Sequence, residues 1–502
     1  IKHILVRQEQ NSVHAASGYA RSVSKPGVCV ATSGPGATNL ITGIATAYMD
    51  SIPIIAITGQ VRSDLIGRDV FQEADITGAC EPFVKHSYLV KNTEDLPRVF
   101  KEAFYIARKG RPGPVLIDVP VDIQTNKIDK FVYPKKADIP GYKPSVQGHI
   151  KQIEKAVALI QSASRPVICA GGGVLTSGSK LKLVEFATKT GIPVVSTMMG
   201  IGVMPTENPL YFGMLGSHGK GVANRAMHEA DVIMLCGARV GDRAVASPDQ
   251  LSAHSKIIHI DIDPAEIGKN VEVTVPIVGD MKNVINKIND TIGDYHVPHM
   301  WADTTERWKK ELFRTAPRFE GCVEPRSFIA KLSEMLPNKS ILVADVGQNQ
   351  IWCANNFRIK EGRFLTTGGM GTMGYSVPAA VGAKFARPDR EVVVVCGDGS
   401  FQMGMNELGT IAQNHLNVKI IIMRNDRLGM VRELQKNLYH QRYTATFLDE
   451  EAPDFMKIAE AYNIDSAYAT SNEEAEKYAK QMIESDKSFV LVCRVSPDTP
   501  SI

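Results

Sequence analysis

Short apolar runs that alternate with helix-forming stretches constrain the fold of this 502-residue chain more than any other feature. Val28–Thr32, Pro166–Ala170 and Val392–Val395 are three such runs, and each is apolar at nearly every position. A strand of that kind is buried on both faces of its sheet, which requires helices on both sides. Regular alternation of such strands with helices predicts parallel sheets. We therefore expect an α/β fold built from doubly wound parallel sheets.

The length of the chain predicts several domains, because a single hydrophobic core rarely grows beyond about 250–300 residues. The alternating pattern forms three blocks, which we expect to be domains at residues 1–125, 148–283 and 326–502. Residues 126–147 are rich in Lys, Pro and Asp and predict a linker. Residues 284–325 predict a second connecting segment, largely helical.

The composition argues against some classes of partner. The net charge is only +3 and no basic tract is interleaved with aromatic residues, so we expect no nucleic acid. No apolar run reaches membrane-spanning length and no secretory signal is visible, so we expect no membrane contact. The eight cysteines lack paired spacing, and Cys169 and Cys396 lie inside apolar runs, which predicts reduced thiols in a cytoplasmic protein. Residues Ile1–Val6 predict a strand already under way, with a segment before it.

The segment after the valine run carries the strongest functional pattern. Gly397-Asp398-Gly399-Ser400 follows one predicted strand, and Asn425 ends the next predicted strand. An Asp and an Asn at neighbouring strand ends offer oxygen ligands that suit Mg²⁺ when phosphate oxygens complete its shell. The small residues let backbone N–H groups approach a diphosphate at a helix N-terminus. A Gly-rich turn without any ligand explains the Gly-Asp-Gly about as well, since such turns are common in α/β proteins.

Three other patterns have a structural explanation beside the functional one. Glu9 lies where an apolar stretch gives way to a helix, and a helix cap is the simpler interpretation of its carboxylate. Met373 follows a glycine-rich loop and could fill an irregular gap in the core. Ala170-Gly171-Gly172-Gly173 resembles a phosphate-binding turn, but no complete GxGxxG motif is present, so the dinucleotide signal is weak.

Three long strings together resemble the thiamine diphosphate (ThDP) enzymes, and specifically the acetohydroxyacid synthase (acetolactate synthase) branch. The first is QEQNSVHAASGYAR at 8–21, the second is the small-residue segment 32–60, and the third is 397–431. In the third string Asn425 lies 27 positions after Asp398, which resembles the family's cofactor motif. The resemblance covers nearly the whole chain and implies pyrimidine, central and diphosphate domains, in that order.

The resemblance implies roles for individual residues around ThDP. Asp398, Asn425 and the backbone carbonyl of Arg427 would hold Mg²⁺. Glu9 would hydrogen-bond the aminopyrimidine ring, and Met373 would support the bent cofactor. The remaining residues expected to bind ThDP are Gln348, Asn349, Gly371, Gly399, Ser400 and Met430. Asn349 stands where the branch usually has a His, so a hydrogen-bond donor is kept but an imidazole is lost.

The same resemblance implies a substrate region and a flavin site. Phe71, Gln72 and Lys85 match residues near the substrate or flavin, with Gln72 and Lys85 expected to act in catalysis. Leu434 stands where the branch usually has a Trp that favours 2-oxobutyrate, so we expect weak discrimination between 2-oxobutyrate and pyruvate. Gly241 stands where many relatives have an Asp. The residues expected to bind FAD, which would have a structural role, are Gly172, Gly173, His218, Gly237, Arg239, Arg243, Asp261 and Asp280.

The implied reaction decarboxylates pyruvate and joins the remaining two-carbon unit to a second 2-oxo acid. Pyruvate as acceptor gives 2-acetolactate, and 2-oxobutyrate gives 2-aceto-2-hydroxybutyrate, as in branched-chain amino acid biosynthesis. The resemblance also implies a homodimer or homotetramer, with a regulatory small subunit as a further partner. The alternatives are another FAD- and ThDP-containing enzyme, such as a pyruvate oxidase, or a cofactor-binding subunit without catalysis. Glyoxylate carboligase fits less well because its usual pattern lacks Glu9, and an NAD-dependent dehydrogenase is remote.

Overall fold

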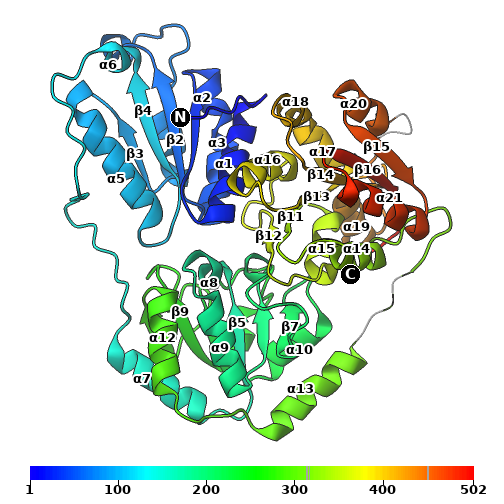
Figure 1. The fold of residues 1–502 in the computed structure, drawn as a ribbon. Helices are drawn as coiled ribbons and strands as arrows, with labels where there is room; N and C mark the ends of the chain where they lie inside the picture. Colours follow the sequence, from blue (N-terminus) through cyan, green and yellow to red (C-terminus); the bar gives the residue numbers. More distant parts are fainter. Residues whose placement is uncertain (313–314, 316, 449–451) are drawn as a thin grey trace.

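Three separate parallel sheets, each with helices packed on it, make up the computed structural model of the chain (Figure 1). The structure describes residues 1–312, 315, 317–448 and 452–502. The three sheets confirm the predicted α/β class with parallel sheets. No helix in the described part of the chain has the length and apolar character needed to span a lipid bilayer.

The first sheet has four strands in the order β1-β2-β4-β3. Helices α1 and α3 pack on it near β1 and β2, and α5 packs on it near β4 and β3 (Figure 1). The elements are α1 Glu9–Val23, β1 Gly27–Ala31, α2 Pro35–Asn39, α3 Ile41–Met49, β2 Ile54–Gln60, α4 Ile76–Cys80, β3 His86–Leu89, α5 Leu96–Arg108, β4 Val115–Pro120 and α6 Val121–Thr125.

The second sheet has six strands in the order β10-β9-β8-β5-β6-β7. In this doubly wound order the chain reverses direction between β5 and β8, and ligands of such sheets bind at the carboxyl ends of the strands beside that switch point. The elements are α7 Ile150–Gln161, β5 Pro166–Ala170, α8 Gly172–Thr176, α9 Lys180–Thr190, β6 Val194–Ser196, β7 Tyr211–Met214, α10 Gly221–Glu229, β8 Val232–Cys236, α11 Pro248–His254, β9 Lys256–Asp261, β10 Val275–Val278, α12 Met281–Thr291 and α13 His299–Glu311.

The third sheet also has six strands, in the order β12-β11-β13-β14-β16-β15. Its switch point lies between β11 and β13, so the residues after these two strands are brought together. The elements are α14 Pro325–Met335, β11 Ile341–Ala344, α15 Gln348–Asn356, β12 Arg363–Leu365, α16 Ser376–Ala386, β13 Val392–Gly397, α17 Asp398–Gly404, α18 Leu408–Gln413, β14 Lys419–Arg424, α19 Gly429–Leu438, α20 Phe455–Ala461, β15 Asp465–Ala469, α21 Asn472–Glu484 and β16 Phe489–Arg494.

The strands that the sequence pattern did not predict are β3, β7, β12 and β15, and each lies at the edge of its sheet. Their runs are short, and three of the four contain half-buried or exposed positions among the buried ones. The predicted strand at Ile1–Val6 is wrong, because these residues form no regular secondary structure and no ladder. Leu5 is exposed there, so the apolar run packs on no neighbouring strand.

The domain bounds drawn from sequence remain a prediction, but the cores show what each segment contacts. Helix α13, within the predicted connecting segment 284–325, places Trp301 and Trp308 in the hydrophobic core of the second sheet. The predicted linker 126–147 is without a helix, and Tyr142 from this segment packs against the core beside α5. Both segments therefore contribute side chains to neighbouring cores.

The first and third sheets are joined within the chain by helix α1 packing against α16 (Figure 1). The two helices approach so closely that a Cβ atom on Gly18 would lie 1.9 Å from the carbonyl oxygen of Ala379. A Cβ atom on Gly382 would likewise lie 1.8 Å from the carbonyl oxygen of Ala15. Glycine is therefore required at both positions, because any side chain would push the helices apart.

Candidate cofactor and catalytic site

Asp398 lies at the switch point of the third sheet, directly after β13 and at the start of α17. Its Oδ1 accepts a hydrogen bond from the Gly399 N–H at 2.9 Å, and its Oδ2 accepts from the N–H groups of Asn425 and Asp426 at 3.0 and 2.6 Å. Only 3% of the residue is exposed. Burial raises the pKa of Asp398 to about 6, although these hydrogen bonds act in the opposite direction.

These hydrogen bonds bring the ends of β13 and β14 together, as the spacing of Asp398 and Asn425 predicted. The Asn425 Oδ1 accepts from the Arg427 N–H at 3.1 Å, which fixes the side chain of Asn425 in the turn. A carboxylate, an amide oxygen and the backbone of Arg427 thus lie in one short turn region, and such a donor set suits a hard divalent cation. Among the described residues no cluster of three or more His, Cys, Asp or Glu could hold a metal, which is compatible with a set containing one carboxylate.

The start of α17 has little free space above its backbone. A Cβ atom on Gly399 would lie 2.9 Å from Leu428 Cδ2, 3.2 Å from Leu448 Cδ1 and 3.6 Å from Met373 Cε. Met373 therefore lies beside the Gly-Asp-Gly turn, where the resemblance places it. Gly371 has a φ of +66° and is exposed, so its loop depends on a conformation that favours glycine.

Gln348 and Asn349 start α15, on the β11 side of the same switch point, and both are buried. The Gln348 Oε1 accepts from Asn425 Nδ2 at 3.3 Å, while Gln348 Nε2 donates to Glu433 Oε2 at 2.8 Å. Asn349 Nδ2 donates to the carbonyl oxygens of Asp345 and Val395 at 2.7 and 3.3 Å. The donors of both amides are thus directed to protein acceptors.

The Ser400 hydroxyl is also bonded within the protein. Its Oγ lies 3.1 Å from both the N–H and the carbonyl oxygen of Gly397, and so closes the first turn of α17. Met430 is half-buried at the start of α19. Sequence reasoning placed both residues at the diphosphate. The structure places Ser400 in the helix turn and Met430 beside the strand end that carries Asn425.

Glu9 lies in the first turn of α1, in the first domain. Its Oε2 accepts from Asn39 Nδ2 at 3.0 Å, and its Oε1 lies 3.5 Å from where a Cβ atom on Gly36 would be. Among the described residues the carboxylate of Glu9 accepts no hydrogen bond from the third sheet. Glu9 and Asp398 are therefore not joined within one chain.

Phe71, Gln72 and Lys85 are not gathered into one site. Phe71 is 87% exposed, and Gln72 has a φ of +60° beside Gly34. Lys85 Nζ donates to Tyr142 Oη at 2.9 Å and to the carbonyl oxygens of Ile106 and Lys109. Burial lowers the pKa of Lys85 to about 8, with nearby Arg111 contributing in the same direction.

The glycines predicted to bind FAD pack on one another at the switch point of the second sheet. Gly173 N–H donates to the Gly237 carbonyl oxygen at 3.0 Å, and a Cβ atom on Gly173 would lie 2.8 Å from Gly237 Cα. A Cβ atom on Gly172 would lie 3.2 Å from Met199 Cβ. Close packing of α8 against the turn after β8 is therefore one reason for these glycines, as the weak motif allowed.

The charged residues predicted for FAD lie in different environments. Arg239 is half-buried and burial lowers its pKa, while the side chain of Arg243 is 77% exposed. Burial raises the pKa of Asp261 to about 6, and its Oδ1 accepts from the Asp263 N–H at 2.9 Å. Asp280 Oδ1 accepts from the N–H groups of Lys282 and Asn283 and so caps α12. His218 is half-buried, and burial lowers its pKa.

Sequence reasoning missed two residues beside Arg239 that link domains. Arg111 Nη1 lies 2.8 Å from Glu266 Oε1 and 3.3 Å from Asp263 Oδ2, which ties the first domain to the second. Asp50 Oδ1 accepts from the Gly369 N–H at 2.8 Å, which ties the first domain to the third, and burial raises the pKa of Asp50. A lone Arg in a Gly- and Pro-rich turn before a strand was the available signal, but such turns are common.

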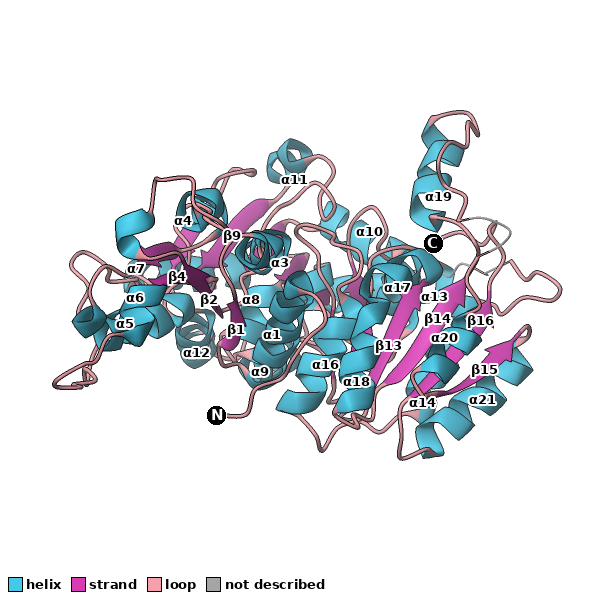
Figure 2. Ribbon diagram, turned by 90° about the horizontal axis from the view of Figure 1, so that it is seen from above, coloured by secondary structure: helices cyan, strands magenta, loops and turns pink. Residues whose placement is uncertain are grey.

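Helix α19 carries Leu434 and stands out from the body of the molecule (Figure 2). None of its residues is buried, and Leu434 is 48% exposed. Arg432 anchors the base of the helix through an ion pair with Asp498 at 2.9 Å. Leu434 is therefore presented on an exposed surface near the end of β14.

This arrangement of three sheets, with an Asp and an Asn meeting at a switch point, is accompanied by sequence matches to one family over all three domains. The chain belongs to the thiamine pyrophosphate (ThDP) enzymes. The model of the family's N-terminal TPP binding domain matches residues 1–79, that of its central domain matches 153–288, and that of its C-terminal TPP binding domain matches 345–493.

Within this family the chain is similar to acetolactate synthases over nearly its full length. It is 45% identical to a probable acetolactate synthase large subunit of Methanocaldococcus jannaschii, over 99% of this chain and 85% of that protein. It is 43% identical to an acetolactate synthase of Arthrospira platensis, over 99% and 87%. It is 46% identical to an acetolactate synthase of Mycobacterium leprae, over 92% and 75%. These similarities confirm the predicted branch and the prediction of a ThDP-dependent acetolactate synthase.

Proposed function

We propose that the chain decarboxylates pyruvate and joins the two-carbon unit to a second 2-oxo acid, giving 2-acetolactate or 2-aceto-2-hydroxybutyrate. The observation that carries the proposal is the meeting of Asp398 with the Asn425 turn at the third sheet's switch point. A site built for a cation and a diphosphate needs oxygen ligands and close backbone N–H groups, and this turn supplies both.

Mg²⁺ fits this turn because Asp398 is a buried carboxylate whose hydrogen-bond partners are backbone N–H groups rather than a basic side chain. Burying a charge is unfavourable unless a counter-charge is present. We assign Asp398, Asn425 and the Arg427 carbonyl as ligands, while Gln348 holds Asn425 in place. Met373 would support the cofactor from beside Gly399.

ThDP, when bound, supplies the nucleophilic carbon that attacks a 2-oxo acid and accepts the electrons left when CO₂ departs. Glu9 would exchange a proton with the aminopyrimidine ring, and Asn39 orients its carboxylate. Because Glu9 and Asp398 are not joined within one chain, we propose a homodimer in which each cofactor lies between two subunits. A homotetramer is two such dimers. The term "large subunit" in the names of relatives supports a regulatory small subunit.

FAD is proposed for the carboxyl end of the second sheet, near Arg239 and Asp261. Support comes from the doubly wound strand order and from a half-buried arginine beside a carboxylate whose pKa burial raises to about 6. The eight free cysteines, all buried except Cys322, support a reducing, cytoplasmic compartment.

The test is an acetolactate assay with pyruvate, ThDP, Mg²⁺ and FAD, in which each cofactor is omitted in turn. We expect acetolactate to require ThDP and Mg²⁺, without oxygen uptake or net reduction of flavin. A matched Asp398→Asn variant controls for chemical background. Oxygen uptake with flavin reduction would instead support an oxidase, and cofactor binding without any product would support a non-catalytic subunit.

A further inference from the structure

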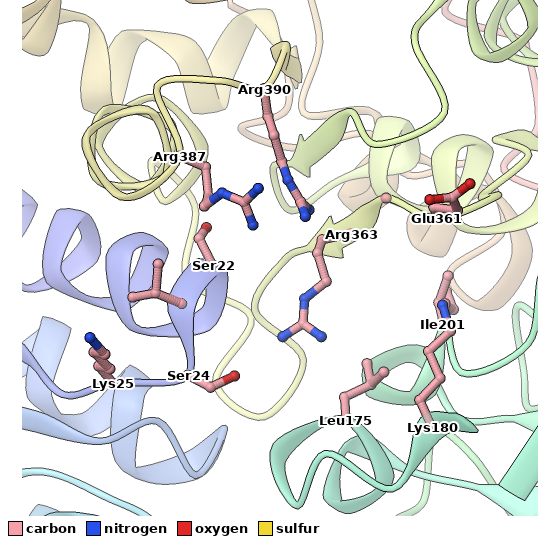
Figure 3. A pocket seen from close by; sticks show the side chains of 13 residues that line it. Ser22, Ser24, Lys25, Leu175, Lys180, Ile201, Glu361, Arg363, Arg387 and Arg390 are labelled. Atoms are coloured by element: carbon pink, nitrogen blue, oxygen red, sulfur yellow. The ribbon is translucent and has the colours of Figure 1, made fainter. Parts of the chain in front are cut away.

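A cavity of about 500 Å³ lies where all three domains meet (Figure 3). The first domain contributes the segment after α1 at 22–25, the second contributes Leu175, Lys180 and Ile201, and the third contributes the start of β12 and the turn before β13. Because that part of the third sheet is formed by the amino ends of its strands, the cavity lies across the sheet from Asp398 and Asn425. It is therefore separate from the proposed Mg²⁺ site.

The walls of this cavity carry a large excess of positive charge. The basic side chains that line it are Lys25, Lys180, Arg363, Arg387 and Arg390, and the acidic one is Glu361. Arg387 is paired with Asp389, at 2.6 Å between Nη2 and Oδ2, and Glu361 lies 3.8 Å from Lys339 Nζ. The charges of Lys180, Arg363 and Arg390 are left without an ion-pair partner among the described residues.

Arg363 and Arg390 are prepared to accept an anion. Arg363 Nη2 donates to the Arg21 carbonyl oxygen at 2.7 Å, and burial together with nearby Arg21 and Arg390 lowers the pKa of Arg363 to about 10. Arg390 Nε is buried and has no hydrogen-bond partner among the described residues. Lys384 Nζ donates to the Arg390 carbonyl oxygen at 2.8 Å, which holds this turn in place. A buried N–H donor without an acceptor is costly, so a ligand oxygen here would be stabilising.

The opposite side of the cavity is partly apolar. Val23, Leu175 and Ile201 contribute aliphatic side chains, and Ser22 and Ser24 contribute hydroxyl groups. Figure 3 shows the guanidinium groups of Arg363, Arg387 and Arg390 around one space, with Leu175 and Ile201 across from them. A guanidinium binds phosphate oxygens through a planar pair of N–H groups, and an apolar wall accommodates a flat ring.

We propose that this cavity binds a phosphorylated ligand of nucleotide size, with its phosphate groups on the arginines and its apolar part against Leu175 and Ile201. The volume lies in the usual range of about 300–1,000 Å³ for small-molecule sites. None of the lining residues is among those predicted to bind ThDP or FAD. A ligand there would contact all three domains at once and so stabilise their relative arrangement.

The test measures ADP binding by calorimetry and by thermal unfolding, on protein saturated with ThDP, Mg²⁺ and FAD so that those sites are filled. We expect ADP to release heat with one site per chain and to raise the Tm by a few degrees at saturation. Inorganic pyrophosphate should bind more weakly, because it lacks the part that contacts the apolar wall. Absence of ADP binding, or citrate binding as tightly as ADP, would overturn the assignment.

Variants locate the binding. Arg390→Gln and Lys180→Gln should each weaken ADP binding by about 10-fold or more, since each removes a charged partner of the phosphates. Lys25→Glu reverses an exposed charge at the rim, should fold normally, and should also weaken binding. Arg307→Gln, on the exposed face of α13, is the matched control and should leave ADP affinity unchanged. Native affinity in Arg390→Gln and Lys25→Glu together would show that ADP binds elsewhere.

Discussion

The second and third sheets each have a switch point with a glycine-rich turn beside it, but the two turns are built differently. In the third sheet the polar groups converge, because Asp398 accepts from the Asn425 turn and Gln348 bonds Asn425. In the second sheet the glycines pack on each other, and Asp280 caps a helix. A strand order therefore places residues at a common edge, and only side-chain hydrogen bonds decide whether they form a preassembled site.

The largest expected effect tests whether the third-sheet turn is the cation site. Asp398→Ala removes the only carboxylate of the proposed ligand set, and we expect Mg²⁺-dependent ThDP affinity to fall by at least about 100-fold. Acetolactate formation should be lost with it. Titration of ThDP by fluorescence quenching at several Mg²⁺ concentrations measures the change. Asp64→Ala, at an exposed ion pair with Arg62, is the control, and native affinity in Asp398→Ala would remove the contrast between the two sheets.

The pH dependence of Mg²⁺ binding sharpens the same point. Burial raises the pKa of Asp398 to about 6, so the metal-free fold holds this proton more tightly than the unfolded chain does. The resulting stability is complete below the unfolded pKa of about 3.9 and is lost as the pH rises through about 6. Mg²⁺ requires the ionised carboxylate, so its affinity should fall about 10-fold per pH unit below 6. Calorimetry from pH 5 to 8 measures this, and a constant affinity between pH 5 and 7 would contradict the assignment.

At the second sheet the expectation is an unequal pair of arginines. Arg239 is half-buried near Asp261, so Arg239→Gln should weaken FAD binding by about 10- to 100-fold, as for a hydrogen bond to a charged group. Arg243 is exposed, and Arg243→Gln should change affinity by no more than about 5-fold. Flavin fluorescence on titration measures both. Equal losses would show that FAD binding draws Arg243 in, so that this site assembles only around its ligand.

The sequence predicted the third-sheet turn because parallel strands fix where their ends lie, and buried valine runs identify those strands with little ambiguity. It did not predict the edge strands β3, β7, β12 and β15, because most of these short runs mix exposed and buried positions. Arg111 and Asp50 could not be found either. Their partners, Glu266 and Gly369, lie in other domains, and no local pattern encodes a contact across that distance. Lys85 was assigned by resemblance, and local packing against Tyr142 explains its position.

The smallest expected effect concerns a residue held by neither turn. Leu434 is exposed on α19, a helix without buried residues, so its side chain contributes little to the fold and is free to act on specificity. Leu434→Trp would add a ring that can contact the extra methyl group of 2-oxobutyrate, and a contact of that size changes selectivity by about 10-fold. Competition between pyruvate and 2-oxobutyrate, read from the ratio of the two products, measures the change at equal conversion. The native chain should show little preference, and Leu434→Ala, which also lacks a ring, should match it. Strong 2-oxobutyrate selectivity in the native chain would place the determinant on a buried residue instead, because a half-exposed leucine cannot hold so small a ligand in one orientation.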